Sequence, residues 1–329
     1  MVIDGFLNNL SKEIGYKFGS PWRYSDKSLG VIIPIIMGDG KGFEEREYIT
    51  IEEAKDQGIS FKDTGKIDRV IVESSLGKLI FIRSGTALKS LGTQPRAVET
   101  SVVIIPDTEK KETRQEIPVR CIHASKPISS GKKFAYAGDV PIEVRSALLS
   151  KSGQGETWSA VGRATNRFMS TRLGSSGSHG YTAGLGSTGF NADNLVGVME
   201  EVDKFTGNID EILAKVPLFE DQVGAVFLDM KDVVGMEMFD HPKSWEAIHK
   251  EVEKRLGEST AKEEDKSFFK PDYERVKPLT LEFLKKLLES EKKETSHGMV
   301  STISLKGDGV VGEATTINGK VIHIVGIKV

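Results

Sequence analysis

The sequence predicts an α+β protein, with mainly antiparallel sheet elements in its N-terminal and C-terminal parts and helices in the middle. Two observations predict this class. Short segments rich in β-branched residues come in runs, instead of alternating regularly with helices as a parallel α/β sheet requires. In the middle of the chain, apolar residues recur at the three- and four-residue spacing of a helix with one buried face.

The composition excludes several classes of protein. The chain has 329 residues and a formal net charge of −3, so it lacks the basic excess of a protein that binds nucleic acid through bulk charge. Its one cysteine, Cys121, excludes an intramolecular disulfide and a cysteine-ligated zinc site. The single cysteine favours a reducing cytoplasm. Because no apolar run approaches the ~18 residues of a membrane span, we expect no membrane partner. The sequence does not indicate an oligomeric state.

The N-terminal residues predict a helix followed by a strand. Apolar residues within 2–18 fall on one helical face, and the sequence from Gly19 to Pro21 then marks a turn. Residues 29–37 form the first strongly apolar run and predict a buried strand. Because proline cannot donate a backbone hydrogen bond to a neighbouring strand, Pro34 predicts that this strand lies at a sheet edge or ends there.

The following part of the chain predicts a series of short strands that are rich in β-branched residues and bounded by turn formers. These strands are 69–73, 78–83, 98–105 and 116–122. The polar stretch 84–100 predicts a loop that connects two of them.

The middle of the chain predicts helices over 141–150 and 156–173, and further helices over 191–205 and 209–215. Between them, residues 174–189 are rich in glycine and serine. Because glycine loses more backbone entropy on ordering than any other residue, this segment predicts a long mobile loop.

The C-terminal part predicts two hairpins and two helices. The second hairpin turns at Asn318-Gly319, the preferred pair for a tight type I′ turn, because both residues tolerate a positive φ. The predicted elements, in chain order, are strands 223–228 and 233–239, helices 242–256 and 279–288, and strands 310–317 and 320–327.

The polar stretch 84–100 is the first candidate for a ligand site. Lys89, Gln94 and Arg96 carry groups that bind phosphate or amide-bearing ligands, and Gly92 allows a ligand to approach the backbone closely. The alternative interpretation is a connection whose polar groups satisfy its own backbone. The sequence does not decide between the two.

A second candidate is the start of the predicted helix that follows residue 153. Gln154 and Gly155 open it, and the free N–H groups at a helix start favour an anion. Trp158 offers a ring on which a base can stack, although a tryptophan at helical spacing is more often part of a core.

Other motifs indicate a ligand less clearly. Cys121 lies beside Arg120 and near His123, which can activate a thiol, but a cysteine within a strand usually packs as a small hydrophobic residue. Residues 184–189 match G-x-G-x-x-G without the preceding strand that a dinucleotide-binding turn needs. No two histidines have metal-ligand spacing, so we predict no metal site.

Several separated blocks of the sequence share a known pattern. They are 29–35, 48–54, 85–106, 117–122, 154–158, 223–227, 233–240, 309–314 and 320–324. In this order they resemble the ARG (ADP-ribosylglycohydrolase) and rhodanese-phosphatase-superfamily-associated protein domain family, a prokaryotic family. The resemblance covers nearly the whole chain, and no single block is a catalytic signature.

The resemblance implies a single family domain over 28–329, preceded by an N-terminal amphipathic helix and linker over 1–27. The Gly/Ser-rich segment 174–189 would be a mobile loop within that domain. The family name records an association with ADP-ribosylglycohydrolases, which implies a link to ADP-ribose or NAD metabolism. Pro95 stands where the family pattern often has asparagine, so chemistry that depends on that side-chain amide is in doubt here.

We expect one of two classes of function. The leading hypothesis is binding or processing of a nucleotide-like ligand related to ADP-ribose or NAD. Lys89 and Arg96 would hold its phosphate, Gln94 would bind its base or ribose, and the backbone around Gly155 would donate N–H groups.

The alternative is a non-enzymatic regulatory or interaction protein that docks on a protein, an RNA or a ribosome. It draws on the lack of a catalytic triad or phosphate loop, and on a local basic patch formed by Arg163, Arg167 and Arg172. The sequence assigns no catalytic residue and no cofactor. It does not decide which of Arg96, Cys121 and His323 is functional.

Overall fold

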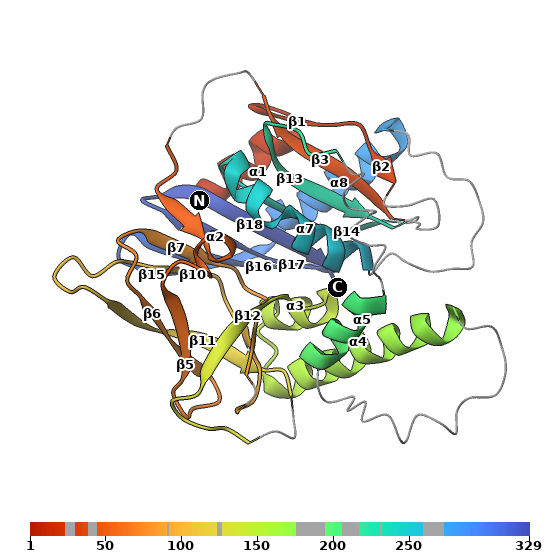
Figure 1. Ribbon diagram of the computed structural model, residues 1–329. Helices are drawn as coiled ribbons and strands as arrows, with labels where there is room; N and C mark the ends of the chain where they lie inside the picture. The colour runs from red at the N-terminus through yellow and green to blue at the C-terminus, as the bar shows by residue number, and fades with distance from the viewer. Residues whose placement is uncertain are drawn as a thin grey trace.

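The fold confirms the predicted α+β class (Figure 1). The computed structural model describes residues 1–23, 30–38, 45–90, 92–123, 127–175, 195–205, 217–229, 232–258 and 273–329. Within these residues, strands from both ends of the chain meet in one large sheet, and a small barrel and a group of helices lie against it.

The large sheet has nine strands among the described residues, and every neighbouring pair in it is antiparallel. Its spatial order is β1-β3-β13-β14-β18-β17-β16-β15, with β2 also paired to β3. The strands are β1 (Tyr16–Phe18), β2 (Trp22–Arg23), β3 (Val31–Met37), β13 (Gln222–Leu228), β14 (Val233–Phe239), β15 (Glu291–His297), β16 (Val300–Gly307), β17 (Val310–Ile317) and β18 (Lys320–Lys328).

The prediction that Pro34 marks a sheet edge or a strand end is wrong. Pro34 lies in the middle of β3, which pairs with β13 on one side and with β1 and β2 on the other. The sheet accommodates the missing N–H because β1 and β2 are separate short strands, and Gly19 between them donates its N–H to the Pro34 carbonyl at 2.8 Å. An interrupted neighbour thus lets a proline occupy an interior strand.

Both predicted hairpins are confirmed, as β13–β14 and β17–β18. Asn318 and Gly319 have φ values of 51° and 77°, as a type I′ turn requires. The hairpin β15–β16 was not predicted. Its first strand is charged and almost wholly exposed, so it lacks the alternation of apolar and polar residues on which the prediction depends.

A closed barrel contains β11-β6-β5-β12-β8-β9, and a three-stranded sheet, β10-β7-β4, packs beside it. The prediction of a loop over 84–100 is wrong, because this stretch contains two barrel strands, β8 and β9. Both are too short to show a clear alternation in the sequence. The barrel strands are β5 (Ile59–Asp63), β6 (Arg69–Ser74), β8 (Thr86–Lys89), β9 (Arg96–Val98), β11 (Thr113–Cys121) and β12 (Lys133–Asp139), and the others are β4 (Tyr48–Thr50), β7 (Leu79–Ile82) and β10 (Val102–Ile104).

Helices cover both faces of the large sheet (Figure 1). On one face α1 and α8 pack against β3, β13 and β17, and on the other face α3 and α7 pack against the same strands. The helices are α1 (Val2–Ser11), α2 (Ile51–Ala54), α3 (Ile142–Leu149), α4 (Gln154–Ser175), α5 (Leu195–Phe205), α7 (Pro242–Glu258) and α8 (Tyr273–Glu289).

The N-terminal helix is shorter than the predicted 2–18. It ends at Ser11 because Glu13 and Gly15 have positive φ values of 55° and 74°, and the chain then enters β1. The helix predicted over 209–215 lies outside the described residues. So does the Gly/Ser-rich segment, except for its first two residues, which end α4.

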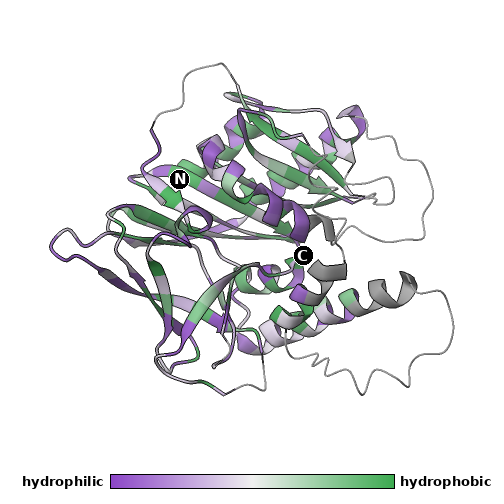
Figure 2. Cartoon of the chain, viewed as in Figure 1, coloured by the Kyte–Doolittle hydropathy of each residue, from purple (hydrophilic) through white to green (hydrophobic). Residues whose placement is uncertain are grey.

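Four hydrophobic clusters hold these layers together. Two lie on the two faces of the large sheet, one fills the barrel, and one joins α3, α4 and α5 to the barrel wall. Figure 2 shows hydrophobic residues along β3 and β13 and hydrophilic residues on the outer side of α7, in keeping with burial of apolar surface. Polar groups inside these layers are therefore exceptions that need an explanation.

Candidate functional site

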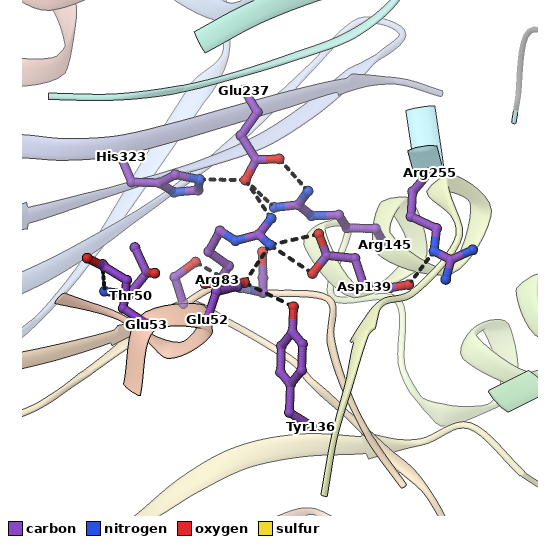
Figure 3. Close-up of polar contacts among 12 residues, drawn as sticks. Thr50, Glu52, Glu53, Arg83, Tyr136, Asp139, Arg145, Glu237, Arg255 and His323 are labelled. Carbon is purple, nitrogen blue, oxygen red and sulfur yellow. Dashed lines mark hydrogen bonds and ion pairs between the residues drawn. The ribbon is translucent and has the colours of Figure 1, made fainter. Parts of the chain in front are cut away.

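A network of buried charged side chains lies where the barrel, α3 and the large sheet meet (Figure 3). Its centre is Glu237 on β14, which faces Arg83 just after β7, Arg145 on α3 and His323 on β18. Each of these four residues is at most 5% exposed. We call the set the Glu237 network, and its members are Glu52, Arg83, Asp139, Arg145, Glu237 and His323.

Glu237 accepts hydrogen bonds from three side chains. Arg145 donates two parallel bonds, Nη1 to Oε2 at 2.6 Å and Nη2 to Oε1 at 2.8 Å. Nη1 of Arg83 and Nε2 of His323 also donate to Oε1, at 3.2 and 2.8 Å. Two parallel arginine–carboxylate bonds are among the strongest polar contacts in proteins, so α3 is held firmly to β14.

Arg83 connects the same carboxylate to two others. Its Nη2 donates to Oε1 of Glu52 on α2 at 2.9 Å and to Oδ1 of Asp139 on β12 at 3.0 Å. Tyr136 on β12 donates its hydroxyl to Glu52 at 3.2 Å. The network thus joins the three-stranded sheet and barrel to the large sheet through charge-assisted contacts.

Burial and charge pull the pKa values of the network in different directions. Burial raises the pKa of Glu237, but the charges of Arg145 and Arg83 outweigh it and hold this pKa well below its usual value. Burial raises the pKa of Asp139 to about 6, because Arg83 and Arg145 offset it only in part. Burial lowers the pKa of His323, so its ring is neutral at pH 7 and donates Nε2–H to Glu237.

The Glu237 network is a structural clamp, because its charges face one another rather than solvent. Sequence reasoning singled out His323 and missed the two arginines. A signal for the centre was present, since Glu237 interrupts the apolar sequence of β14, and a charged residue at a core position needs a partner. Nothing in the sequence identifies Arg83 and Arg145 as those partners.

The structure brings four predicted site residues together around Cys121, at the end of β11. Gln94 accepts a hydrogen bond from the Cys121 thiol at 3.1 Å. Gln154, the first residue of α4, accepts from the Cys121 backbone N–H at 3.1 Å and donates to its carbonyl at 2.7 Å. Trp158 and Arg96 lie near enough to the thiol to lower its pKa.

Arg96 is completely buried in this cluster. Its Nη1 donates to the backbone carbonyl of Gln94 at 2.8 Å and to its side-chain Oε1 at 3.3 Å, while Nη2 lies 3.7 Å from Asp63. Burial lowers the pKa of the guanidinium from its usual value. In this conformation Arg96 stabilises the segment before β9, and a ligand would reach it only if that segment moved.

The Cys121 thiol is neutral in this setting. Burial raises its pKa, and the nearby His123 N–H, Arg96 and Trp158 offset this only in part. Both acceptors near the sulfur, Gln94 Oε1 and the His123 carbonyl at 3.0 Å, fit a protonated thiol that donates. A buried thiol with a raised pKa is a poor nucleophile, so its role here is packing and hydrogen bonding.

The other two residues from 84–100 lie at a separate place, in a cleft of about 870 Å³ between the barrel and α5. We call it the lysine cleft. It is lined by Lys89, Ser90, Gly92, Pro95, Lys132, Lys133, Phe134, Ala135, Val196, Gly197 and Glu200. Gly92 makes room for the Lys132 stem, because an added Cβ would lie 3.1 Å from Lys132 Cδ.

The remaining predicted residues are not gathered in either place. Gly155 lies in the open first turn of α4, where an added Cβ would meet nothing within 4 Å. Arg163 and Arg167 on α4 pair with Glu156 at 2.7 Å and Glu143 at 2.6 Å, and the Arg172 side chain lies outside the described residues. The motif at 184–189 lies outside them too.

Two features are absent from the described part of the chain. No three or more histidine, cysteine, aspartate and glutamate side chains there are arranged to hold a metal ion. Of the helices that the structure describes, none has the length and apolar character needed to cross a membrane.

Comparison with known proteins agrees with the resemblance in the sequence. No curated protein and no solved structure is significantly similar to this chain. The model of one protein family, described as the ARG and Rhodanese-Phosphatase-superfamily-associated Protein domain, matches residues 15–327. Because the match spans nearly the whole chain, the protein belongs to this family.

Proposed function

We propose that this protein binds a phosphate-bearing, nucleotide-like ligand, of the ADP-ribose or NAD class, in the lysine cleft. The observation that carries the proposal is the charge of the cleft. Among the described residues that line it, Lys89, Lys132 and Lys133 stand against a single carboxylate, that of Glu200. Such a surface attracts an anion, and a concave one concentrates the attraction.

The contacts around Lys89 support an exchangeable anion. Its Nζ lies 2.7 Å from Glu200 Oε1, and both side chains are 48% exposed. An exposed ion pair of this kind contributes little to stability, so a ligand phosphate can replace the carboxylate at small cost.

The size and apolar part of the cleft suit the rest of such a ligand. Its volume of about 870 Å³ falls within the range of small-molecule sites. Pro95, Phe134 and Val196 supply apolar surface beside the lysines, against which a ribose or base can pack.

The test is calorimetric titration of ADP-ribose and NAD into the parent protein and two matched double variants. Lys132→Ala/Lys133→Ala removes two adjacent lysines of the cleft, and Lys110→Ala/Lys111→Ala removes two adjacent exposed lysines elsewhere. A hydrogen bond to a charged group is worth about 1.5–3 kcal/mol, so loss of a single such contact weakens binding at least ten-fold. We expect that loss only in the first variant.

Equal affinity of all three proteins for ADP-ribose would place its phosphates elsewhere. Absence of binding to the parent protein would contradict the proposal itself, and would favour the alternative of docking on a macromolecular partner. Weakening of ADP-ribose binding by added salt in the parent protein alone would further support an ionic contact to the cleft lysines.

A further inference from the structure

A second cavity, distant from the lysine cleft in the fold, contains an unusual set of titratable side chains. It has a volume of about 710 Å³ and is lined by residues of α1, β1, the start of β4, the segment just after β14 and the start of β18. We call it the Asp240 groove. Among its lining residues are Phe6, Tyr16, Arg46, Tyr48, Asp240 and His241.

Asp240 has one short hydrogen bond and one longer ion pair. Its Oδ1 accepts the hydroxyl of Tyr48 at 2.8 Å, and the same hydroxyl lies 2.9 Å from Ser244 Oγ. The other oxygen, Oδ2, is 3.5 Å from Nζ of Lys320, longer than an ordinary N–H···O hydrogen bond. Oδ2 therefore has acceptor capacity for a donor that enters the groove.

The Tyr48 hydroxyl is itself fixed in place. Arg46 donates to Ser244 Oγ at 2.9 Å and to Glu53 at 2.6 Å, and Ser244 and Tyr48 are at most 2% exposed. Because Ser244 and Arg46 hold the hydroxyl, the Asp240 carboxylate is oriented before any ligand arrives. An acceptor that needs no reorganisation loses less free energy on binding.

Aromatic rings line the groove beside this carboxylate. Phe6 and Tyr16 have ring centroids 5.6 Å apart at an angle of 60°, and each is only partly buried. Burial, and then the charge of Asp240, raise the pKa of the Tyr16 phenol, so the ring and the carboxylate share one environment. A planar ring in the groove thus meets aromatic surface and a hydrogen-bond acceptor together.

The charge of the lining disfavours an anionic ligand. Among the described residues of the lining, the carboxylates of Glu45, Glu47 and Asp240 stand against the two cations Arg46 and Lys320. Burial lowers the pKa of His241, so this ring is neutral at pH 7 and adds no positive charge. The groove therefore differs from the lysine cleft, where cations prevail.

We propose that the Asp240 groove binds the amino-bearing base of a nucleoside, with the exocyclic amino group donating to Asp240 and the ring packed on Tyr16 and Phe6. Carboxylates accept from the amino groups of bases, and aromatic side chains stack on base faces. This inference does not rest on the function proposed for the lysine cleft, because a nucleoside carries no phosphate.

The test compares adenosine with purine riboside, which is the same nucleoside without the amino group. We expect purine riboside to bind the parent protein at least ten-fold more weakly, measured by calorimetry or by ligand-observed NMR. Asp240→Asn turns the acceptor into an amide, and we expect it to abolish the preference for adenosine. Asp232→Asn, at the other end of β14, is the matched control and leaves the preference unchanged.

Several other results would overturn the proposal. Equal binding of the two nucleosides to the parent protein, or no binding of either, would overturn the proposal. So would adenosine binding that Lys132→Ala/Lys133→Ala abolishes and Asp240→Asn retains, because the nucleoside would then lie in the lysine cleft. If Asp240→Asn does not fold, the two nucleosides are compared on the parent protein and on Lys132→Ala/Lys133→Ala, and loss of the preference for adenosine in that variant overturns the proposal.

Discussion

Two carboxylates three residues apart, Glu237 within β14 and Asp240 just after it, have opposite environments. Glu237 accepts from two arginines and a histidine in a sealed interior, and their charges hold its pKa well below the usual value despite burial. Asp240 accepts from one tyrosine at the wall of a groove, and burial raises its pKa.

The two environments give the two carboxylates different roles, since one stabilises the fold and the other can bind a ligand. A carboxylate with all its acceptors used stabilises the fold and has nothing left for a ligand. A carboxylate with spare acceptor capacity costs free energy in the unbound protein and regains it when a donor arrives. We therefore expect substitutions in the Glu237 network to change stability first, and substitutions in the groove and cleft to change binding first.

The largest effect is expected from Glu237→Gln. The substitution removes the negative charge that Arg83 and Arg145 share in the interior. Breaking a buried ion pair costs about 3–5 kcal/mol, a large part of the free energy of unfolding of an ordinary domain. Urea denaturation followed by circular dichroism measures this loss directly.

Asp240→Asn is the control for this substitution, since it also neutralises a carboxylate at the end of the same strand. Asparagine still accepts from Tyr48, and removal of a buried charge relieves its desolvation, so we expect a change of less than about 1 kcal/mol. Equal losses for the two variants would remove the distinction between the clamp and the groove.

Asp139 is expected to have a smaller effect on the free energy of unfolding, and this effect depends on pH. The pKa of Asp139 is about 6 in the folded protein, above its ordinary value of 3.8, so the folded state binds this proton more tightly than the unfolded state. This contribution to stability therefore grows as the pH falls from about 7 to 4 and is lost as the pH rises through 6. A shift of about two units corresponds to about 3 kcal/mol.

Asp139→Asn isolates that contribution from other groups, which have pH dependences of their own. Burial lowers the pKa of both His241 and His323, so these rings oppose the trend below about pH 6.5. The measured quantity is the difference in unfolding free energy between the parent protein and the variant at several pH values. A difference that stays constant from pH 7 to 4.5 would show that Asp139 does not titrate near 6.

The hairpins β13–β14 and β17–β18, the helices α3, α4 and α5 and the α+β class could be predicted from the sequence, because they depend on local signals. The tolerance of Asn318 and Gly319 for a positive φ predicts their turn. The helical spacing of apolar residues predicts the buried face of α8. The pairing of Arg83 with Glu237 could not be predicted, since 154 residues separate them and no local preference records the contact. Short barrel strands such as β8 fail for a related reason, because four residues cannot display a period.

The sequence indicated which residues could bind a ligand, but the fold places them at two separate sites. Gln94, Arg96, Gln154 and Trp158 lie together at Cys121, because β9 and β11 are neighbours and α4 begins against the end of β11. Lys89 and Gly92, from the same stretch of sequence, line the lysine cleft instead. The Asp240 groove was not predicted, since its residues come from four distant segments.

The smallest effect on stability is expected from Lys89→Ala, which tests whether a cleft residue changes binding without changing stability. Lys89 and Glu200 form an ion pair with both side chains about half exposed, so solvent screens it and its loss changes the unfolding free energy by less than about 0.5 kcal/mol. If Lys89 contacts phosphate, the same variant weakens ADP-ribose binding several-fold, and both quantities are measured on one sample by denaturation and calorimetry. A loss of stability above 1 kcal/mol with unchanged binding would instead mean that Lys89 attaches α5 to the barrel, and that the cleft charge serves the fold.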